Sequence, residues 1–334
     1  MPQTWTTQQA NDWLAKTGWL VGFNYLPATA VNSTEMWQAE TFDTETMQRE
    51  LALAARHGYN TCRVFLPFIV WHTQNDAFMR NLDEFLCIAD ANHISVMPIL
   101  FDDCAFAGKE PYAGAQDAPV MGVHNSGWTP SPGSAIADNP HMEAQLAAYV
   151  LQIVGTYAND PRVVVWDIYN EVGGNDRKEA GLPLLRKAFH WAREVKPSQP
   201  LTACVWAYAD YDTIAAELSD VVSFHEYSAL AETEKRLAAL RQYNRPLLCT
   251  EWLHRPNGNT FESHLPFFRR ENIGAYHWGL VQGRTQTHLN WDTMGGTPNP
   301  NPDLWQHDVF RANHAPYHAE ELAILQTMMI EQAQ

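Results

Sequence analysis

Short apolar runs alternate with helical patterns along the whole chain, and this alternation limits the fold more than any other feature of the sequence. The apolar runs predict strands at 19–25, 61–66, 94–101, 163–169, 201–206, 221–227, 246–251 and 274–280. Helical spacing predicts helices at 44–57, 81–92, 142–157, 184–195, 212–218, 232–243, 261–271 and 319–329. Strands that alternate with helices pair in parallel, and eight such units favour a closed barrel. The sequence therefore predicts the α/β class, and within it a single (β/α)8 TIM barrel with long loops after the strands.

The length and composition are typical of one domain. The chain has 334 residues, of which 46% are hydrophobic, and this is enough apolar surface for one large core. No internal repeat and no linker interrupts the alternation of strands and helices. We therefore expect residues 1–334 to form a single barrel domain.

The chain is strongly acidic, which argues against several classes of partner. Its formal net charge is −16, and a surface of this sign repels phosphate backbones and anionic lipid headgroups. No stretch of roughly 18 apolar residues is present, so no membrane-spanning helix is predicted. We expect no nucleic-acid partner and no membrane partner, and the sequence leaves the oligomeric state open.

The N-terminal segment and the cysteines bear on the cellular compartment. Residues 1–19 lack a basic stretch followed by an apolar run, which is the pattern of a signal peptide. The cysteines lie mostly inside apolar runs, which favours reduced thiols over a disulfide framework or a metal site. These observations predict a cytoplasmic protein.

Polar and aromatic residues occupy nearly every predicted strand end. In a parallel barrel the carboxyl ends of the strands meet at one face, where such side chains converge. The residues at or just after these ends are Asn24, Tyr25, Arg63, Asp102, Asp103, Asn170, Glu171, Trp206, His225, Tyr227, Glu251 and Trp278. A purely structural barrel does not need such groups at nearly every strand exit, so we interpret the set as an active site.

Two glutamates in this set can divide the work of acid and base. Glu171 follows the fourth predicted strand, and Glu251 ends the seventh. Two carboxyl groups that face each other across a barrel mouth suit glycoside hydrolysis, because one can protonate the leaving oxygen while the other attacks the anomeric carbon or activates water. The two groups need different pKa values, which different neighbours can supply. We therefore predict that Glu171 and Glu251 are the catalytic residues.

The segments around these glutamates resemble a known group of enzymes. WDIYNE (166–171) and LLCTEW (247–252) are similar to the two catalytic signatures of clan A of the glycoside hydrolases, and in particular to family 5, the cellulase-like enzymes. The resemblance covers nearly the whole chain and also includes Arg63, His225, Tyr227 and Trp278. It implies a retaining β-glycosidase that hydrolyses β-linked oligosaccharides by double displacement, without a metal or other cofactor.

The resemblance also implies individual roles. Glu171 would be the acid/base and Glu251 the nucleophile. Arg63 would keep Glu251 ionised, and Tyr227 would donate a hydrogen bond to it. Asn170 would bind the sugar 2-hydroxyl, with His225 close by on the sixth strand. Trp278 would form the platform under the sugar in the −1 subsite.

The family pattern also includes a histidine near the end of strand three. Here that strand ends in Asp102 and Asp103, so the candidate is His124 in the loop that follows. We expect both Asp102 and His124 to bind substrate.

The fourth strand must depart from regular geometry if both of its last residues serve the site. Asn170 and Glu171 are adjacent, and adjacent side chains of a regular strand point to opposite faces. A bulge or bend at this point is therefore expected. The acid/base glutamate of the family is usually followed by proline, whereas Val172 follows here, which predicts a different path for the next loop.

Two tryptophans in loops are expected to shape the substrate site. Trp37 lies in the polar loop after strand one, and Trp128 lies in the long segment 102–139 after strand three. Indole faces stack on the C–H faces of sugars. We expect both residues to enclose the site, with Trp37 as a substrate-binding residue, so that short units are released from chain ends.

The sequence is also compatible with three other functions. A secreted endo-β-glycanase, acting as a cellulase, mannanase or xylanase, would carry the same catalytic pair. A sugar isomerase with a divalent metal could use Asp102, Glu171, His225 and Glu251 as ligands, although it would not require the tyrosine and tryptophan of the strand ends. A barrel that only binds carbohydrate would usually lack one of the two glutamates.

Overall fold

The computed structural model describes residues 4–332 and has the predicted barrel. Its eight strands form one sheet in the order β5-β4-β3-β2-β1-β8-β7-β6, and all the paired strands are parallel. The N–H of Val205, just after β5, donates to Ser223 O (2.9 Å), and the N–H of His225 donates to Val205 O (3.0 Å). These bonds join the two edges of the sheet, so the predicted (β/α)8 fold is confirmed.

The observed strands coincide with the eight predicted apolar runs. They are β1 (Val21–Asn24), β2 (Thr61–Phe65), β3 (Ser95–Asp102), β4 (Trp166–Asn170), β5 (Leu201–Ala203), β6 (Val222–His225), β7 (Leu247–Glu251) and β8 (Gly274–Trp278). Their side chains are almost all buried on both faces, as in parallel sheets covered by helices. The predicted fourth strand was too long at its start, because Val163 forms only an isolated bridge with Val96.

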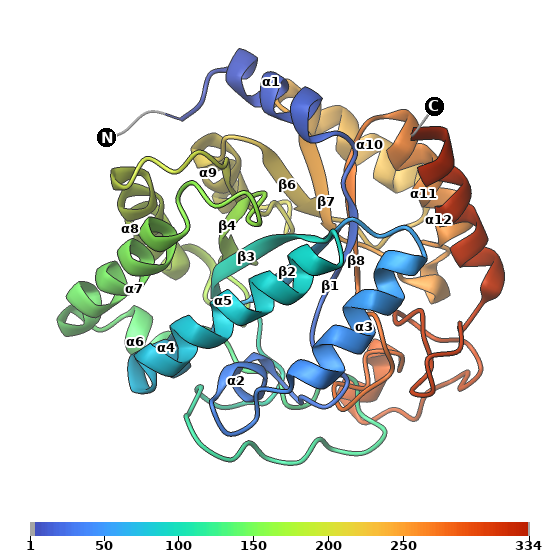
Figure 1. The fold of residues 1–334 in the computed structure, drawn as a ribbon, viewed down its shortest axis with the longest axis horizontal. Coiled ribbons are helices and arrows are strands. Elements are labelled where there is room, and N and C mark those ends of the chain that lie inside the picture. Colours follow the sequence, from blue (N-terminus) through green and yellow to red (C-terminus); the bar gives the residue numbers. More distant parts are fainter. Residues whose placement is uncertain (1–3, 333–334) are drawn as a thin grey trace.

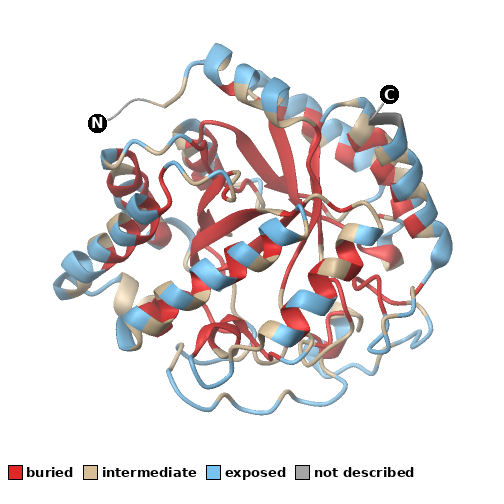
Figure 2. Cartoon of the chain, in the orientation of Figure 1, coloured by how far each residue is buried: buried red, intermediate tan, exposed pale blue. Residues whose placement is uncertain are grey.

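Helices cover the outside of the barrel. In chain order they are α1 (Thr7–Thr17), α2 (Ser33–Trp37), α3 (Thr44–Arg56), α4 (Phe68–Thr73), α5 (Asn75–Ala91), α6 (Ser134–Ala137), α7 (Glu143–Thr156), α8 (Leu182–Glu194), α9 (Asp210–Leu218), α10 (Leu230–Leu240), α11 (Phe261–Arg270) and α12 (Ala319–Gln332). The longer helices between the strands each have a buried face and a face exposed to solvent (Figure 2), the amphipathic pattern that made most of them predictable, whereas the short α6 has no buried residue. None of the helices within residues 4–332 combines the length and apolar character needed to cross a membrane.

The amino ends of the strands are closed by a helix that was not predicted. Helix α1 begins after Thr6, whose side chain and that of Gln9 form a reciprocal capping box. Ala10 of α1 packs with Leu20, Val165 and other residues near the strand starts. In Figure 1 α1 lies at one end of the barrel, and the long loops lie at the other. Any site therefore has to open at the carboxyl ends of the strands.

Two long segments cover those carboxyl ends. The first is the predicted irregular segment after β3, which pairs back on the strand through Asp102 and Ser131. The second follows β8 and contains a 3-10 helix, η5 (Trp291–Gly295). Hydrogen bonds join the two, including Asn125 N–H to Thr285 O (2.7 Å) and Gln286 Nε2 to Val120 O (2.8 Å). Together they form one side of the mouth of the barrel.

Candidate active site

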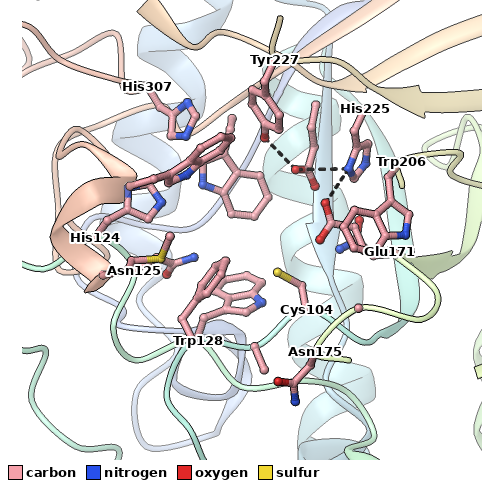
Figure 3. Close-up of a pocket in the computed structure, with 18 of the residues that line it drawn as sticks. Cys104, His124, Asn125, Trp128, Glu171, Asn175, Trp206, His225, Tyr227 and His307 are labelled. Carbon is pink, nitrogen blue, oxygen red and sulfur yellow. Dashed lines mark hydrogen bonds and ion pairs between the residues drawn. The ribbon is translucent and has the colours of Figure 1, made fainter. Parts of the chain in front are cut away.

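A cavity of about 490 Å³ lies at the carboxyl end of the barrel (Figure 3). The predicted site residues on its wall are Asn170, Glu171, His225, Tyr227, Glu251, Trp278 and His124. Arg63 lies directly beneath, with no exposed surface. The strand ends thus bring most of the predicted set together, while Asp102 and Trp37 lie elsewhere.

Arg63 on β2 connects the residues at the base of the site. Its Nη1 donates to Asn24 Oδ1 (2.7 Å) and to Glu251 Oε1 (2.8 Å). Its Nη2 donates to Asn170 Oδ1 (2.6 Å), and both Nε and Nη2 donate to Asp167 Oδ2. A planar guanidinium can hold several partners at fixed angles, which a lysine cannot do. Arg63 therefore fixes the positions of Glu251 and Asn170 relative to each other.

Glu251 receives a donor on each carboxylate oxygen. Arg63 approaches Oε1, and the hydroxyl of Tyr227 donates to Oε2 at 2.8 Å. Burial raises the pKa of Glu251, as does the neighbouring Glu171, and Arg63 and Tyr227 oppose that increase by favouring the carboxylate form. This environment is suited to a group that must be ionised when substrate binds.

Glu171 has a different environment. Burial raises its pKa to about 7, opposed by a hydrogen bond from Cys104 and by the more distant charge of Arg63. No guanidinium contacts its carboxyl group among the described residues. Near pH 7 it can therefore both hold and release a proton, as a general acid/base must.

The backbone at Glu171 shows the expected departure from strand geometry. Its φ is 44°, in the left-handed region that non-glycine residues rarely adopt. The N–H of Glu171 donates to Cys204 Sγ (3.1 Å), which holds this conformation. The bend lets Asn170 and Glu171 face the same cavity although they are adjacent. Val172 is buried, and its carbonyl accepts from Trp206 Nε1 (3.0 Å), so the next loop turns back to β5.

His225 lies between the two glutamates. Its Nδ1 is 2.9 Å from Glu171 Oε1 and 3.5 Å from Glu251 Oε2. Burial lowers the pKa of His225 to about 4, so the ring is neutral at pH 7. One oxygen of Glu171 and one of Glu251 lie within 4.8 Å of each other. A neutral imidazole can bridge this gap without adding a charge.

Asp102 supports the site from behind, which corrects its predicted role. It is buried and is not on the cavity wall. Its Oδ1 accepts from Asn170 Nδ2 (2.8 Å), and its Oδ2 accepts from Trp128 Nε1 (2.9 Å). The expectation that Asp102 contacts substrate is therefore wrong; its carboxylate positions Asn170 and Trp128, which do line the cavity.

The aromatic residues divide between the cavity and the core. Trp278 and Trp128 line the cavity and pack edge to face, with ring centroids 5.6 Å apart. Trp37 has no exposed surface, packs on Phe42, Phe78 and Phe85, and donates from Nε1 to Phe65 O. The prediction that Trp37 binds substrate is wrong, because the loop after β1 folds into α2 and turns this indole into the core.

The segment after β8 supplies part of the wall that was expected from Trp37. Trp291 and Met294 of η5 and the later His307 line the cavity. Trp291 packs edge to face on Tyr227, with centroids 4.9 Å apart. These residues were not predicted, since they follow the last strand by more than ten positions. The signal in the sequence was the unusual length of this segment before α12, together with its tryptophan.

The two glutamates and His225 also offer the ligand atoms of a three-residue metal site. Both oxygens of Glu251 already accept hydrogen bonds, and one of them contacts the permanent cation of Arg63 at 2.8 Å. A divalent cation at this position would be repelled by the guanidinium. Asp102, the fourth ligand of the metal alternative, is engaged behind the cavity wall. The donor set therefore fits a carboxylate pair better than it fits a metal.

Comparison with protein families gives a match over much of the chain. Residues 112–289 match the family described as glycosyl hydrolases family 2, TIM barrel domain. This region includes Glu171, Glu251 and the loop that carries His124. No curated protein matches the sequence.

Solved structures with the same fold include several glycoside hydrolases. One is a family 5 mannosidase from Rhizomucor miehei, with 14% identity, coverage of 94% of this chain and 93% of that chain, and a TM-score of 0.61. Another is the exo-beta-1,4-mannosidase Op5Man5 from Opitutaceae bacterium strain TAV5, with 17% identity, coverage of 94% and 59%, and a TM-score of 0.67. A third is a GH5_18 variant from Streptomyces cattleya in complex with Manb1-4GlcNAc, with 13% identity, coverage of 93% and 80%, and a TM-score of 0.61. At these identities the similarity establishes the fold.

Proposed function

We propose that this chain, which belongs to the glycosyl hydrolase family 2 TIM barrel domains and is a glycoside hydrolase, is a retaining β-glycosidase that acts on short β-linked oligosaccharides. Glu171 is the acid/base of this proposal, and Glu251 is the nucleophile. One observation carries it: two carboxyl groups with oxygens within 4.8 Å share a cavity, and only Glu251 accepts hydrogen bonds from Arg63 and Tyr227. Retaining enzymes have carboxyl groups roughly 5–5.5 Å apart, whereas inverting enzymes need roughly 6.5–9.5 Å to admit a water.

The reaction follows from these surroundings in two steps. Glu171, protonated near neutral pH, gives its proton to the glycosidic oxygen while the Glu251 carboxylate attacks the anomeric carbon. The leaving group departs and a glycosyl ester forms on Glu251. Glu171, now ionised, takes a proton from water, which attacks the same carbon and releases Glu251. Arg63 and Tyr227 hold the Glu251 oxygens throughout, and Asn170 Nδ2 has a second N–H available for the sugar 2-hydroxyl.

Hydrolysis of a nitrophenyl β-glycoside, followed by proton NMR, tests the stereochemistry. We expect the first-formed sugar to be the β-anomer, because two displacements at one carbon restore its configuration. Spectra recorded before mutarotation distinguish the two outcomes. An initial α-product would mean an inverting enzyme and would overturn the double-displacement proposal. Activity that survives EDTA would also separate this enzyme from a metal-dependent barrel.

The proposal includes cleavage at chain ends. The cavity is bounded opposite Glu171 by His124 and Asn125 of the segment after β3, and Trp291 of the segment after β8 also lines it. Such a pocket suits a terminal sugar. The mannosidases among the structural neighbours make β-mannosides the first substrates to try, alongside glucosides, galactosides and xylosides. An endo-acting β-glycanase is the second candidate function, since the same catalytic pair can serve an open cleft.

Viscosity separates these two modes of action. We expect the enzyme to release a monosaccharide or another short unit from oligosaccharides, with little loss of viscosity in solutions of β-mannan, β-glucan or xylan. The physical reason is that a cavity bounded on one side admits the terminus of a sugar chain but not an internal segment. A rapid fall in viscosity with few reducing ends would instead establish endo action.

A further inference from the structure

Asn125 has an unusual position on the cavity wall. Its exposed fraction is 1%, and neither Oδ1 nor Nδ2 has a hydrogen-bond partner among the described residues. Its side chain is nevertheless part of the cavity lining. A buried carboxamide with no partner is costly, so natural proteins seldom keep one without a use.

The local fold does not account for this carboxamide. Asn125 has a φ of 45°, a conformation that asparagine tolerates better than most residues and glycine better still. Its backbone is already satisfied, because its N–H donates to Thr285 O and its carbonyl accepts from Trp128 N–H. Glycine would serve the turn equally well. The fold thus gives no reason for a carboxamide at the cavity wall whose two donors and two acceptor sites are all unpaired.

The location of Asn125 indicates which part of a substrate it would meet. Figure 3 shows His124 and Asn125 on one side of the cavity, with Glu171 and Trp206 on the other. The acid/base protonates the leaving oxygen, so the leaving group lies on the side of Glu171. The opposite wall therefore faces the sugar whose anomeric carbon reacts, or the sugar beyond it.

His124 completes this wall as a hydrogen-bond acceptor. Its Nδ1 lies 2.8 Å from the carbonyl of Leu289, which can only accept, so Nδ1 carries the proton. Its Nε2 is then an unprotonated acceptor. Burial lowers the pKa of His124 to about 4, which keeps the ring neutral at pH 7. His124 and Asn125 together can give and accept hydrogen bonds, as neighbouring sugar hydroxyls require.

This wall lacks a positive charge. Among the described residues that line the cavity, the one permanent cation is Arg236. Its Nη1 donates to both oxygens of the buried Glu226, each at 3.0 Å, so its charge is already paired. The carboxylate of a hexuronic acid would therefore find no free cation on this wall, whereas an uncharged sugar meets only neutral donors and acceptors.

We propose that Asn125, together with His124, is a specificity-determining residue that hydrogen-bonds hydroxyl groups of an uncharged sugar at the end of the cavity opposite Glu171. This inference rests on the proposed glycosidase function and adds the residue that selects the sugar. A site built to bind a hydroxyl rejects an analogue that lacks it, because the polar groups of the protein are then left unpaired.

The test compares Asn125→Gly with Asn175→Gly. Asn175 also lines the cavity and has a φ of 50°, so glycine removes a carboxamide from either position without backbone strain. Both variants and the wild type are assayed with the best nitrophenyl β-glycoside of the panel, with its monodeoxy analogues and with the corresponding glucuronide. We expect wild type to discriminate against at least one deoxy analogue by roughly 100-fold in kcat/KM, the effect of leaving one buried polar group unpaired. Asn125→Gly should lose a similar factor on the parent glycoside and almost nothing on that analogue, whereas Asn175→Gly should keep the wild-type discrimination.

Other results would overturn the inference. An equal loss on every analogue would mean that Asn125 acts only through the fold, and no loss at all would mean that it meets no hydroxyl. Preference for the glucuronide would contradict an uncharged sugar. If wild type hydrolyses none of the glycosides, the proposed function fails separately, and saturation-transfer NMR with the free monosaccharides then decides. Sugar binding that is lost in Asn125→Gly but kept in Asn175→Gly supports the inference; binding unchanged in Asn125→Gly, or absent in wild type, overturns it.

Discussion

Glu251→Ala is expected to lower kcat by about 10⁴-fold or more on every substrate, because no other described carboxylate in the cavity can reach the anomeric carbon from the same side. Glu171→Ala should lower kcat/KM by about 10²–10⁴-fold on natural oligosaccharides but much less on dinitrophenyl glycosides, whose leaving group needs no proton. The pH dependence of wild type should also report Glu171. Since burial raises the pKa of Glu171 to about 7, wild-type kcat/KM on substrates with poor leaving groups should fall as pH rises through about 7, and this decrease at alkaline pH should be absent in Glu171→Ala.

Azide rescue tests which glutamate is the acid/base and which is the nucleophile. Azide should rescue Glu171→Ala and yield a β-glycosyl azide, since it replaces water in the second displacement. A β-glycosyl azide from Glu251→Ala, with an α-glycosyl azide from Glu171→Ala, would show that the two roles are reversed.

Glu50→Gln is the control for changing a buried carboxyl group. Burial also raises the pKa of Glu50 to about 7, but its partners are Tyr25 and Ala28, outside the cavity. It should keep wild-type activity.

Arg63→Met should reduce both stability and activity. Arg63 and Asp167 are fully buried and Glu251 is nearly so, and removing the guanidinium leaves two buried carboxylates without their cation. Breaking one side of a buried ion pair typically lowers the free energy of unfolding by about 3–5 kcal/mol. The pKa of Glu251 should rise once Arg63 no longer favours its ionised form, so the acid limb of kcat/KM should move to higher pH.

Arg193→Met separates the two effects. Arg193 is also buried, donates to Asp220 at 2.8 Å, and lies outside the cavity. Urea unfolding should show a loss of stability in both variants, whereas only Arg63→Met should shift the pH profile. A folded Arg63→Met enzyme with the wild-type acid limb would mean that Arg63 holds the barrel together without acting on Glu251.

The barrel and the proximity of Glu171 and Glu251 could be predicted from the sequence for a local reason. The period of apolar residues distinguishes strand from helix within each segment, and parallel strands necessarily bring their carboxyl ends to one face. Glu171 and Glu251 therefore had to lie near each other, although 80 positions separate them. The bend at Glu171 was predictable too, because two adjacent side chains cannot share one face of a regular strand.

The walls of the cavity were decided by the tertiary structure. Trp37 and Trp291 both lie in polar segments after strands, yet one turns into the core and the other faces the cavity. The path of such segments depends on bonds between distant residues, for example His124 N–H to Thr293 Oγ1 at 2.9 Å. A loop has no period that reveals which side chain points inward, whereas strand ends do. The sequence by itself therefore determined the fold and which carboxylates meet, and only the packing of the two long segments decided which other side chains line the cavity.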